Sequence, residues 1–187
     1  LHLLSSLLYQ GDSHVFLREL LQNAIDANSL RRARHQLEAK DDPNSRPPRA
    51  TIYFDVKHAD NGDVTITCRD SGIGMDEVTV RNYLAKAGVS FWQSDQFQSM
   101  NPGFTPIGCF GIGMLSCFSV ANEVEVLTKR YDWPDPKTEP LRIRIANVAH
   151  QFRIEQAPDT TPTGTSITVH VLGERLRELW CVRHAVE

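Results

Sequence analysis

Six short segments in which apolar and polar residues alternate constrain the fold of this chain most strongly. A period of two is the pattern of a strand with one buried face. The first two segments flank Asn61-Gly62, a dipeptide that favours a tight hairpin turn. Helical patterns come early and most strands come late, which favours an α+β two-layer sandwich over a doubly wound parallel sheet. The six segments are residues 50–56, 63–69, 123–129, 142–147, 150–156 and 164–172.

Helical and loop patterns fill the rest of the chain. Apolar periodicity predicts helices at 1–9, 14–38 and 76–87, in the second half of 108–121, and from Glu174 onward. The polar, proline-rich residues 40–49 are typical of a surface loop. Residues 89–107 have no clean periodicity and contain both Gly and Pro. Because this connection is long, we predict a functional loop or lid there.

Composition narrows the class of protein. The chain has 187 residues, 41% hydrophobic and 23% charged, which suits one globular domain with a sizeable core. A net charge of −3 argues against binding to nucleic acid or to a membrane surface. No apolar run is long enough to cross a bilayer. The four cysteines form no C-x-x-C pair, so we expect free thiols and a cytoplasmic location. The chain begins with Leu1, and we expect it to be part of a longer protein.

One helical stretch, FLRELLQNAIDA at 16–27, carries an unusual polar row. Glu19, Asn23 and Asp26 are spaced at i, i+4 and i+7, on one stripe of the helix. The solvated face of an amphipathic helix could look similar. However, the row contains no basic partner, and Asn is unfavourable in a helix interior because its amide competes for the backbone. We therefore expect a functional role for these side chains.

Two glycine-rich turns point to anion binding. DSGIGM at 70–75 follows a strand, and GCFGIGM at 108–114 precedes a helix. Backbone N–H groups at such turns attract phosphate, and glycine lets the backbone approach closely. Neither turn is a P-loop or a dinucleotide fingerprint, because the required lysine and third glycine are missing. Each turn alone could be an ordinary turn or the start of a helix.

The motifs are far more specific in combination. A helix with E-x-x-x-N-x-x-D, a strand with D-x-G-x-G, a loop, G-x-x-G-x-G before a helix, and a strand with G-T follow in this order. This order resembles the GHKL ATPase superfamily. The heat-shock-90 chaperone branch fits best, because FLRELLQNAIDA, DSGIGM, AKAG and IGCFGIGMLSCFSVANEVEVLTK all resemble its sequence. Sensor histidine kinases and sacsin-type repeats fit less well.

The resemblance implies a fold and an activity. The fold would be the Bergerat-type two-layer α/β sandwich, with a mixed, mostly antiparallel sheet and helices on one face. Residues 1–187 would form a single ATP-binding domain, with 89–107 as the ATP lid. The activity would be ATP binding and slow Mg²⁺-dependent hydrolysis that drives a chaperone-like cycle in a homodimer, weak or absent in the isolated domain. The alternatives are a nucleotide-gated scaffold, or another superfamily ATPase of the topoisomerase or sensor-kinase type.

The resemblance also implies roles for individual residues. Glu19 would be the general base, beside Arg18, and Asn23 would ligate Mg²⁺. Asp70 would accept a hydrogen bond from the adenine amino group, with Thr165 behind it and Asp26 as support at the base of the pocket. The remaining residues expected to contact ATP or ADP are Gly72, Gly74, Met75, Asn82, Lys86, Gly108, Gly111, Ile112, Gly113 and Met114.

This sequence departs from the branch at several positions. Cys109 stands where glutamine is usual, Met114 where an aromatic residue is usual, and Leu30 where a lysine is expected. The stretch between Met75 and Ala85 is a few residues shorter than in the chaperones, which puts the match of Asn82 in doubt. These departures indicate a divergent member.

Overall fold

The computed structural model describes residues 15–39, 44–86, 88–100, 103–108, 113–132, 138–146 and 151–173. The helices predicted at 1–9 and from Glu174 onward lie outside this part of the chain. Within the described part, no helix is long and apolar enough to span a membrane.

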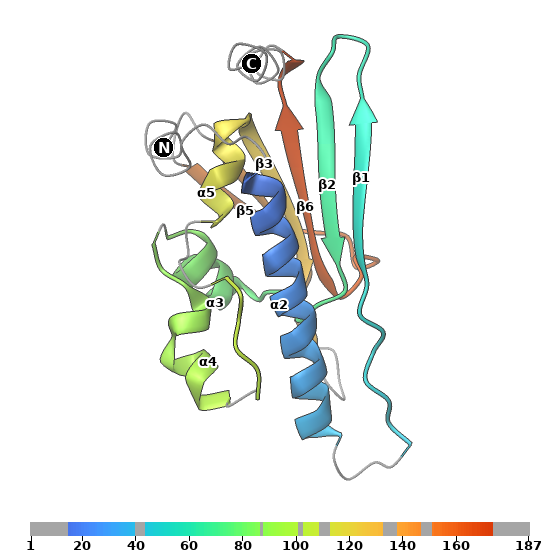
Figure 1. The fold of residues 1–187 in the computed structure, drawn as a ribbon, viewed down its shortest axis with the longest axis vertical. Coiled ribbons are helices and arrows are strands. Elements are labelled where there is room, and N and C mark those ends of the chain that lie inside the picture. Colours follow the sequence, from blue (N-terminus) through green and yellow to red (C-terminus); the bar gives the residue numbers. More distant parts are fainter. Residues whose placement is uncertain are drawn as a thin grey trace, which may run out of the picture.

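The described strands form one six-stranded sheet (Figure 1). Its order is β1-β2-β6-β3-β4-β5, and all five pairings are antiparallel. The prediction of a mixed sheet is therefore corrected. Strands β2 and β3 run in the same direction, but β6 lies between them, so no parallel pair forms among the described strands. The strands are β1 (Ile52–His58), β2 (Val64–Asp70), β3 (Ala121–Lys129), β4 (Leu141–Ala146), β5 (Gln151–Gln156) and β6 (Gly164–Val171).

The predicted hairpin joins β1 and β2. Gly62 has a φ of +87°, a conformation that glycine adopts without strain, and its N–H donates to the carbonyl of Ala59 over 3.0 Å. The far end of β6 is tied to the same turn, because the N–H of Gly173 donates to the Asp63 carboxylate over 2.9 Å. The turn therefore fixes the register of the sheet at this end.

A long helix, α2 (Val15–Glu38), crosses one face of the sheet (Figure 1). It matches the helix predicted at 14–38. Phe16, Leu20 and Ala24 on its buried side pack on alternate residues of the strands, including Val126 and Val169. Short α5 (Gly113–Ser116) and the 3₁₀ turn η3 (Cys117–Ser119) lie beside α2, where a longer helix was predicted. Helices on one face of an antiparallel sheet confirm the α+β prediction.

The segment after the first glycine-rich turn is shorter than the helix predicted at 76–87. It consists of α3 (Glu77–Thr79) and one π-helical turn, η1 (Val80–Leu84). The Asp76 carboxylate caps α3 by accepting the N–H of Thr79 over 2.7 Å. The N–H of Ala85 then donates to the Val80 carbonyl over 2.9 Å, which is the π-type bond that ends the element.

The described residues of 89–107 contain more regular structure than the irregular loop predicted from their pattern. They contain a 3₁₀ turn, η2 (Phe91–Gln93), and a short helix, α4 (Asp95–Met100). Aromatic rings of Phe91, Trp92, Phe97 and Phe104 meet edge to face, 5.2–6.4 Å apart. This aromatic cluster, rather than helical periodicity, orders the segment, and it packs on Leu30, Ile73 and Tyr131 as a second core.

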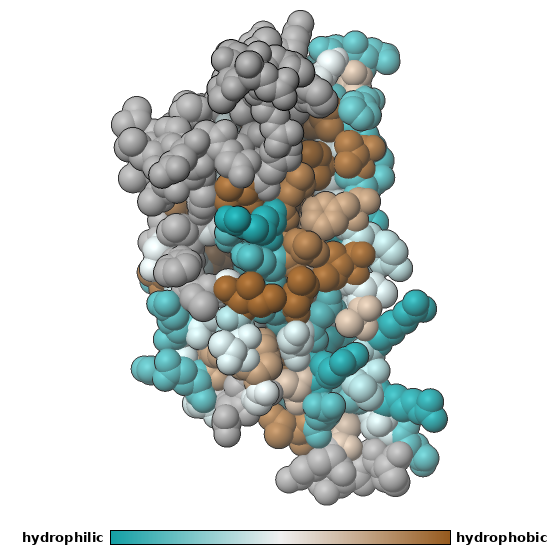
Figure 2. All heavy atoms as spheres, in the orientation of Figure 1, coloured by the Kyte–Doolittle hydropathy of each residue, from teal (hydrophilic) through white to brown (hydrophobic). Residues whose placement is uncertain are grey.

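Apolar side chains also remain exposed on the helical face. Figure 2 shows brown side chains gathered between α2 and the strands β1 and β2. Exposed apolar residues on these elements include Leu21 and Ile25 of α2 and Phe54 and Val56 of β1.

Candidate functional site

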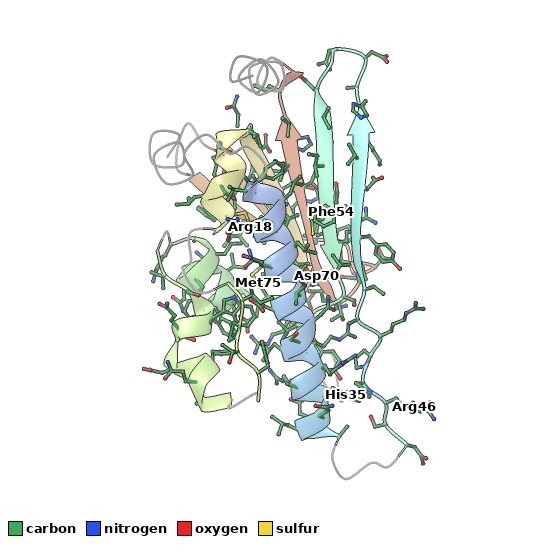
Figure 3. The ribbon with its side chains drawn as sticks, viewed as in Figure 1. Arg18, His35, Arg46, Phe54, Asp70 and Met75 are labelled. Atoms are coloured by element: carbon green, nitrogen blue, oxygen red, sulfur yellow. The ribbon has the colours of Figure 1, made fainter. Side chains whose placement is uncertain are left out.

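A cavity of about 620 Å³ lies between α2, the ends of β2 and β6, and the segment that begins at η1. This volume is within the range of sites for small molecules and cofactors. Figure 3 labels Arg18 near the beginning of α2, and Asp70 and Met75 beside its middle. The predicted site residues that line the cavity are Arg18, Glu19, Asn23, Asp70, Gly74, Met75, Gly108, Gly113, Met114 and Thr165.

Asp70 and Thr165 form the floor of the cavity. They stand directly opposite each other at the paired ends of β2 and β6. One carboxylate oxygen of Asp70 accepts the N–H of Gly72 over 2.7 Å. Burial raises the pKa of Asp70 to about 7, although the N–H groups of Gly72 and Thr165 and the charge of Arg31 act in the opposite direction. The cavity therefore has at its base a carboxyl group that changes charge near neutral pH.

Two glycines let the DSGIGM turn pass close to its neighbours. A Cβ on Gly72 would lie 2.5 Å from the Cβ of Ala27, and one on Gly74 would lie 2.0 Å from the Lys129 carbonyl oxygen. Gly74 also has a φ of +63°. Gly72 is buried against α2 and does not line the cavity, whereas Gly74 does. The turn therefore needs glycine at both positions for packing as well as for access.

Thr128 is a site residue that the sequence did not indicate. It is fully buried on β3, and its hydroxyl oxygen accepts the N–H of Met75 over 2.9 Å. The same hydroxyl donates to the Gly164 carbonyl over 3.1 Å and lies 3.2 Å from the hydroxyl of Thr165. Thr128 thus links the turn to β6. Only the pairing of β3 with β6 brings these residues together.

The polar row of α2 lies on the opposite wall. Glu19 and Asn23 both line the cavity. A Cβ on Gly113 would lie 2.7 Å from a carboxylate oxygen of Glu19, so glycine at the start of α5 leaves room for this group. Arg18 is mostly exposed, with its guanidinium 3.9 Å from the Glu19 carboxylate.

Asp26, the third residue of the row, does not line the cavity. It is 1% exposed, and its carboxylate accepts the N–H groups of Ile107 and Gly108 at 2.8–2.9 Å. Burial raises the pKa of Asp26, and these two N–H groups act against the increase. Asp26 therefore ties the end of the 89–107 segment to α2, where the second glycine-rich turn begins.

Other predicted residues are placed differently. Asn82 and Lys86 are exposed and do not line the cavity, and Tyr83 lines it in their vicinity. Asn82 and Tyr83 both belong to the π-helical turn η1, and only Tyr83 lines the cavity. Gly111 and Ile112 lie outside the described residues.

Further residues line the cavity that the sequence analysis did not predict as site residues. Phe91 and Trp92 come from the aromatic cluster, and Tyr83 packs on Phe91 with ring centroids 5.3 Å apart. Arg34 and Arg130 also line the cavity, and each is paired with an acid. The unusual density of aromatic residues at 91–104 was the only indication in the sequence.

The donor set on α2 fits Mg²⁺. The side-chain oxygens of Asn23 and Glu19 line one cavity, and Mg²⁺ takes few protein oxygens while keeping several waters. The described residues contain no group of three or more His, Cys, Asp or Glu side chains arranged to hold a metal. A metal here would therefore rely on Asn23, water and ligand phosphates.

Comparison with known proteins agrees with this geometry. A family model described as histidine kinase-, DNA gyrase B- and HSP90-like ATPase matches residues 12–166. The chain belongs to this ATPase family. The description of the family includes the heat-shock-90 type that the motifs resemble, and the predicted resemblance to the GHKL ATPases is confirmed.

Individual relatives of this ATPase-family chain are chaperones. The chain is 30% identical to the chaperone protein HtpG of Mycobacterium ulcerans over 184 residues, which cover 92% of the chain and 27% of that protein. It is 31% identical to HtpG of Mycobacterium leprae, over 88% of the chain and 25% of that protein. It is 34% identical to HtpG of Borreliella burgdorferi, over 70% of the chain and 20% of that protein. The chain thus spans about a quarter of the length of these relatives.

Proposed function

We propose that the cavity binds ATP and that this domain hydrolyses it slowly, with Mg²⁺, to drive a chaperone-like conformational cycle. The observation that carries this proposal is that the predicted catalytic residues and the predicted adenine-binding residues line opposite walls of the same cavity. Glu19 and Asn23 of α2 face one cavity with Asp70 and Thr165 at the end of the sheet. Membership of the ATPase family and the similarity to HtpG chaperones support it.

Asp70 would recognise adenine. An ionised carboxylate only accepts hydrogen bonds, so it selects the amino group of adenine over the keto oxygen of guanine. Gly74 and Met75 would line the purine, with Thr165 beside Asp70. Tyr83 lines the cavity next to exposed Asn82, and we assign to Tyr83 the nucleotide contact that the sequence predicted for Asn82.

Glu19 would orient the attacking water and accept its proton. Phosphoryl transfer requires mainly positioning and charge stabilisation, so one placed carboxylate suffices. Asn23 would hold Mg²⁺ through its amide oxygen, and the bound ion would offset the charge of the phosphates. Backbone N–H groups of Gly108, Gly111 and Gly113 would contact the phosphates, with Ile112 and Met114 in the same turn. Lys86 would approach them when the 89–107 lid closes.

A scaffold that binds nucleotide without turnover is the second candidate. The position of Glu19 favours hydrolysis, because a pure binding site does not need a carboxylate near the phosphates, where it repels them. The chaperone cycle further implies a homodimer and protein clients. Calorimetric titration with ADP tests the nucleotide site directly.

In that titration, Asp70→Asn is compared with Asp55→Asn, a change at an exposed carboxylate on β1. In Asp70→Asn the new side-chain amide would present its own donor to the adenine amino group, which costs about 1–3 kcal/mol. We expect ADP affinity to fall at least about tenfold in Asp70→Asn and to stay unchanged in the control. Equal affinity in both variants would remove Asp70 from the nucleotide site.

A further inference from the structure

Arg31 lies behind the floor of the cavity rather than in its lining. It comes from α2, and its guanidinium donates a hydrogen bond to the carbonyl of Ser71, the residue that follows Asp70. The guanidinium carbon also lies 4.7 Å from the centroid of the Tyr131 ring, which is a stacking distance for a cation on an aromatic face. Arg31 therefore bridges the turn after β2 and the segment after β3.

The partners of Arg31 are themselves held in place. The N–H of Tyr131 donates to the Ile73 carbonyl over 2.7 Å, and its hydroxyl lies 2.7 Å from Nδ1 of His35. Ser71 is held by Thr51, whose N–H donates to the Ser71 hydroxyl over 2.8 Å. These bonds fix the guanidinium in a half-buried position, so its charge has a defined distance from the cavity floor.

The charge of Arg31 lowers the pKa of Asp70, in addition to the larger effect of the Gly72 and Thr165 N–H groups. Arg31, on α2, is the charged side chain that lowers the pKa of Asp70. Cys68 lies on the same strand as Asp70, but burial raises the pKa of its thiol to about 12, so the thiol is neutral. Arg130 also lines the cavity, but its guanidinium is 2.6 Å from the Asp76 carboxylate and is largely neutralised there. Burial alone would otherwise favour the protonated form of Asp70.

We propose that Arg31 is a positioning residue for adenine selection, which keeps Asp70 in the ionised form that accepts a hydrogen bond from the adenine amino group. This inference rests on the proposed nucleotide site. A protonated Asp70 would instead offer a donor, which suits the keto oxygen of guanine. Arg31 therefore controls both the affinity for adenine nucleotides at neutral pH and the preference for adenine over guanine.

The test compares Arg31→Gln with Arg31→Lys and with Arg32→Gln, which removes a charge from the exposed neighbouring position. Gln keeps a donor for the Ser71 carbonyl but loses the charge, whereas Lys keeps the charge. ADP and GDP affinities are measured by calorimetry between pH 5.5 and 9, and thermal melts report folding. If Arg31→Gln does not fold, Arg31→Met replaces it as the variant without the charge, and NMR titration of the Asp70 carboxyl in Arg31→Met, Arg31→Lys and the wild type provides the same comparison.

In the wild type we expect ADP affinity to change with a midpoint near pH 7, as the pKa of Asp70 predicts. In Arg31→Gln the midpoint should rise by about one pH unit, since an opposite charge nearby lowers a carboxyl pKa by about 1–3 units. ADP should then bind about fivefold more weakly at pH 7 and within about twofold of wild type at pH 9. The ratio of ADP to GDP affinity should fall, and Arg31→Lys and Arg32→Gln should resemble the wild type.

Two outcomes would overturn the inference while leaving the nucleotide site intact. One is a pH profile in Arg31→Gln that matches the wild type. The other is an equal loss of ADP affinity at every pH in both Arg31→Gln and Arg31→Lys, which would indicate a purely structural role. A wild type that binds no ADP at any pH would instead overturn the proposed function, and the inference with it.

Discussion

At the scale of single residues, the carboxylates on the two walls of the cavity differ in environment. Glu19 is partly exposed, with 20% of its side chain accessible, and it lies beside glycine at position 113. Asp70 is only partly exposed at the end of β2, and desolvation by burial raises its pKa to about 7. One group is therefore available to water in the cavity, and the other is adapted to contact a ligand.

Replacement of Glu19 by Ala should separate binding from hydrolysis. The carboxylate is needed to orient and deprotonate water, and it contributes little to holding the nucleotide. In a hydrolysis-competent longer protein that contains this chain, we expect turnover to fall by about 10² or more while ADP affinity is retained. Turnover by a phosphate-release assay checks this, with Glu77→Ala, an exposed change on α3, as the control. An unchanged rate in Glu19→Ala would exclude it as the base.

Replacement of Asp70 by Asn should stabilise the empty protein although it weakens binding. Burial raises the pKa of Asp70 above its ordinary value of 3.8, so between that value and about pH 7 the folded state binds more protons than the unfolded state. The stability that protonation provides is present at low pH and is lost as the pH rises through about 7. Asn cannot ionise and keeps an oxygen to accept the N–H of Gly72.

The melting temperature of nucleotide-free Asp70→Asn should therefore exceed that of the wild type at pH 8, and the difference should be smaller at pH 5. Calorimetric or fluorescence melts at both pH values test this expectation. A variant that is less stable than the wild type at pH 8 would mean that the ionised carboxylate stabilises the fold. A group that contacts the ligand but lowers the stability of the empty protein is an example of the trade-off between stability and function.

At the scale of elements, α2 and the end of the 89–107 segment are coupled through Asp26. Its carboxylate accepts two backbone N–H groups at Ile107 and Gly108. The aromatic cluster, which runs from Phe91 to Phe104, holds the same segment on the second core. The segment is thus attached both to α2 and to the second core.

Asp26→Ala should release the end of this segment. The substitution leaves two N–H groups without their acceptor, which costs about 1–3 kcal/mol for groups that stay buried. We expect hydrogen exchange at Ile107 and Gly108 to accelerate by at least about tenfold, while exchange in β3 and β6 is unchanged. Ser29→Ala, on the same helix, is the control, because the Ser29 hydroxyl donates to the Ile25 carbonyl within α2. Unaltered exchange at Ile107 would show that other contacts hold the segment.

At the scale of the whole molecule, the described part of the chain lacks an arginine held toward the phosphate side of the cavity. Arg130 is paired with Asp76 and Arg34 with Glu38, each within 2.7 Å. Arg18 is 63% exposed and lies loosely beside Glu19. A positioned arginine can contribute about 10³–10⁵ in rate in phosphoryl transfer. Residues 1–187 alone should therefore bind nucleotide but hydrolyse it slowly or not at all.

Turnover should be higher in a longer protein that contains this chain and is allowed to dimerise. The rate of ATP hydrolysis by residues 1–187 is compared with that of the longer protein over a range of concentrations. We expect the longer protein to be faster and its rate per chain to increase with concentration. Equal rates that do not depend on concentration would contradict the chaperone-type cycle.

The sequence by itself determined the local elements and the order of the motifs. Periods of two and of 3.6 located the strands and the 24-residue helix α2, because side-chain periodicity is a property of neighbouring residues. Asn61-Gly62 likewise predicted its hairpin, since turn geometry depends on a few consecutive backbone angles. The row of Glu19, Asn23 and Asp26 followed from helical spacing alone.

Only the tertiary structure decided how these elements meet. It inserted β6 between β2 and β3, so that Thr128 and Thr165 became neighbours although 37 positions separate them. In the folded chain Tyr83, rather than Asn82, lines the cavity. The Asp26 carboxylate accepts a backbone hydrogen bond from Gly108, and Arg31 lies behind Asp70. Each of these contacts depends on strand order, helix rotation or the path of a loop. They are set by the packing of the whole core, and a local sequence pattern carries no information about them.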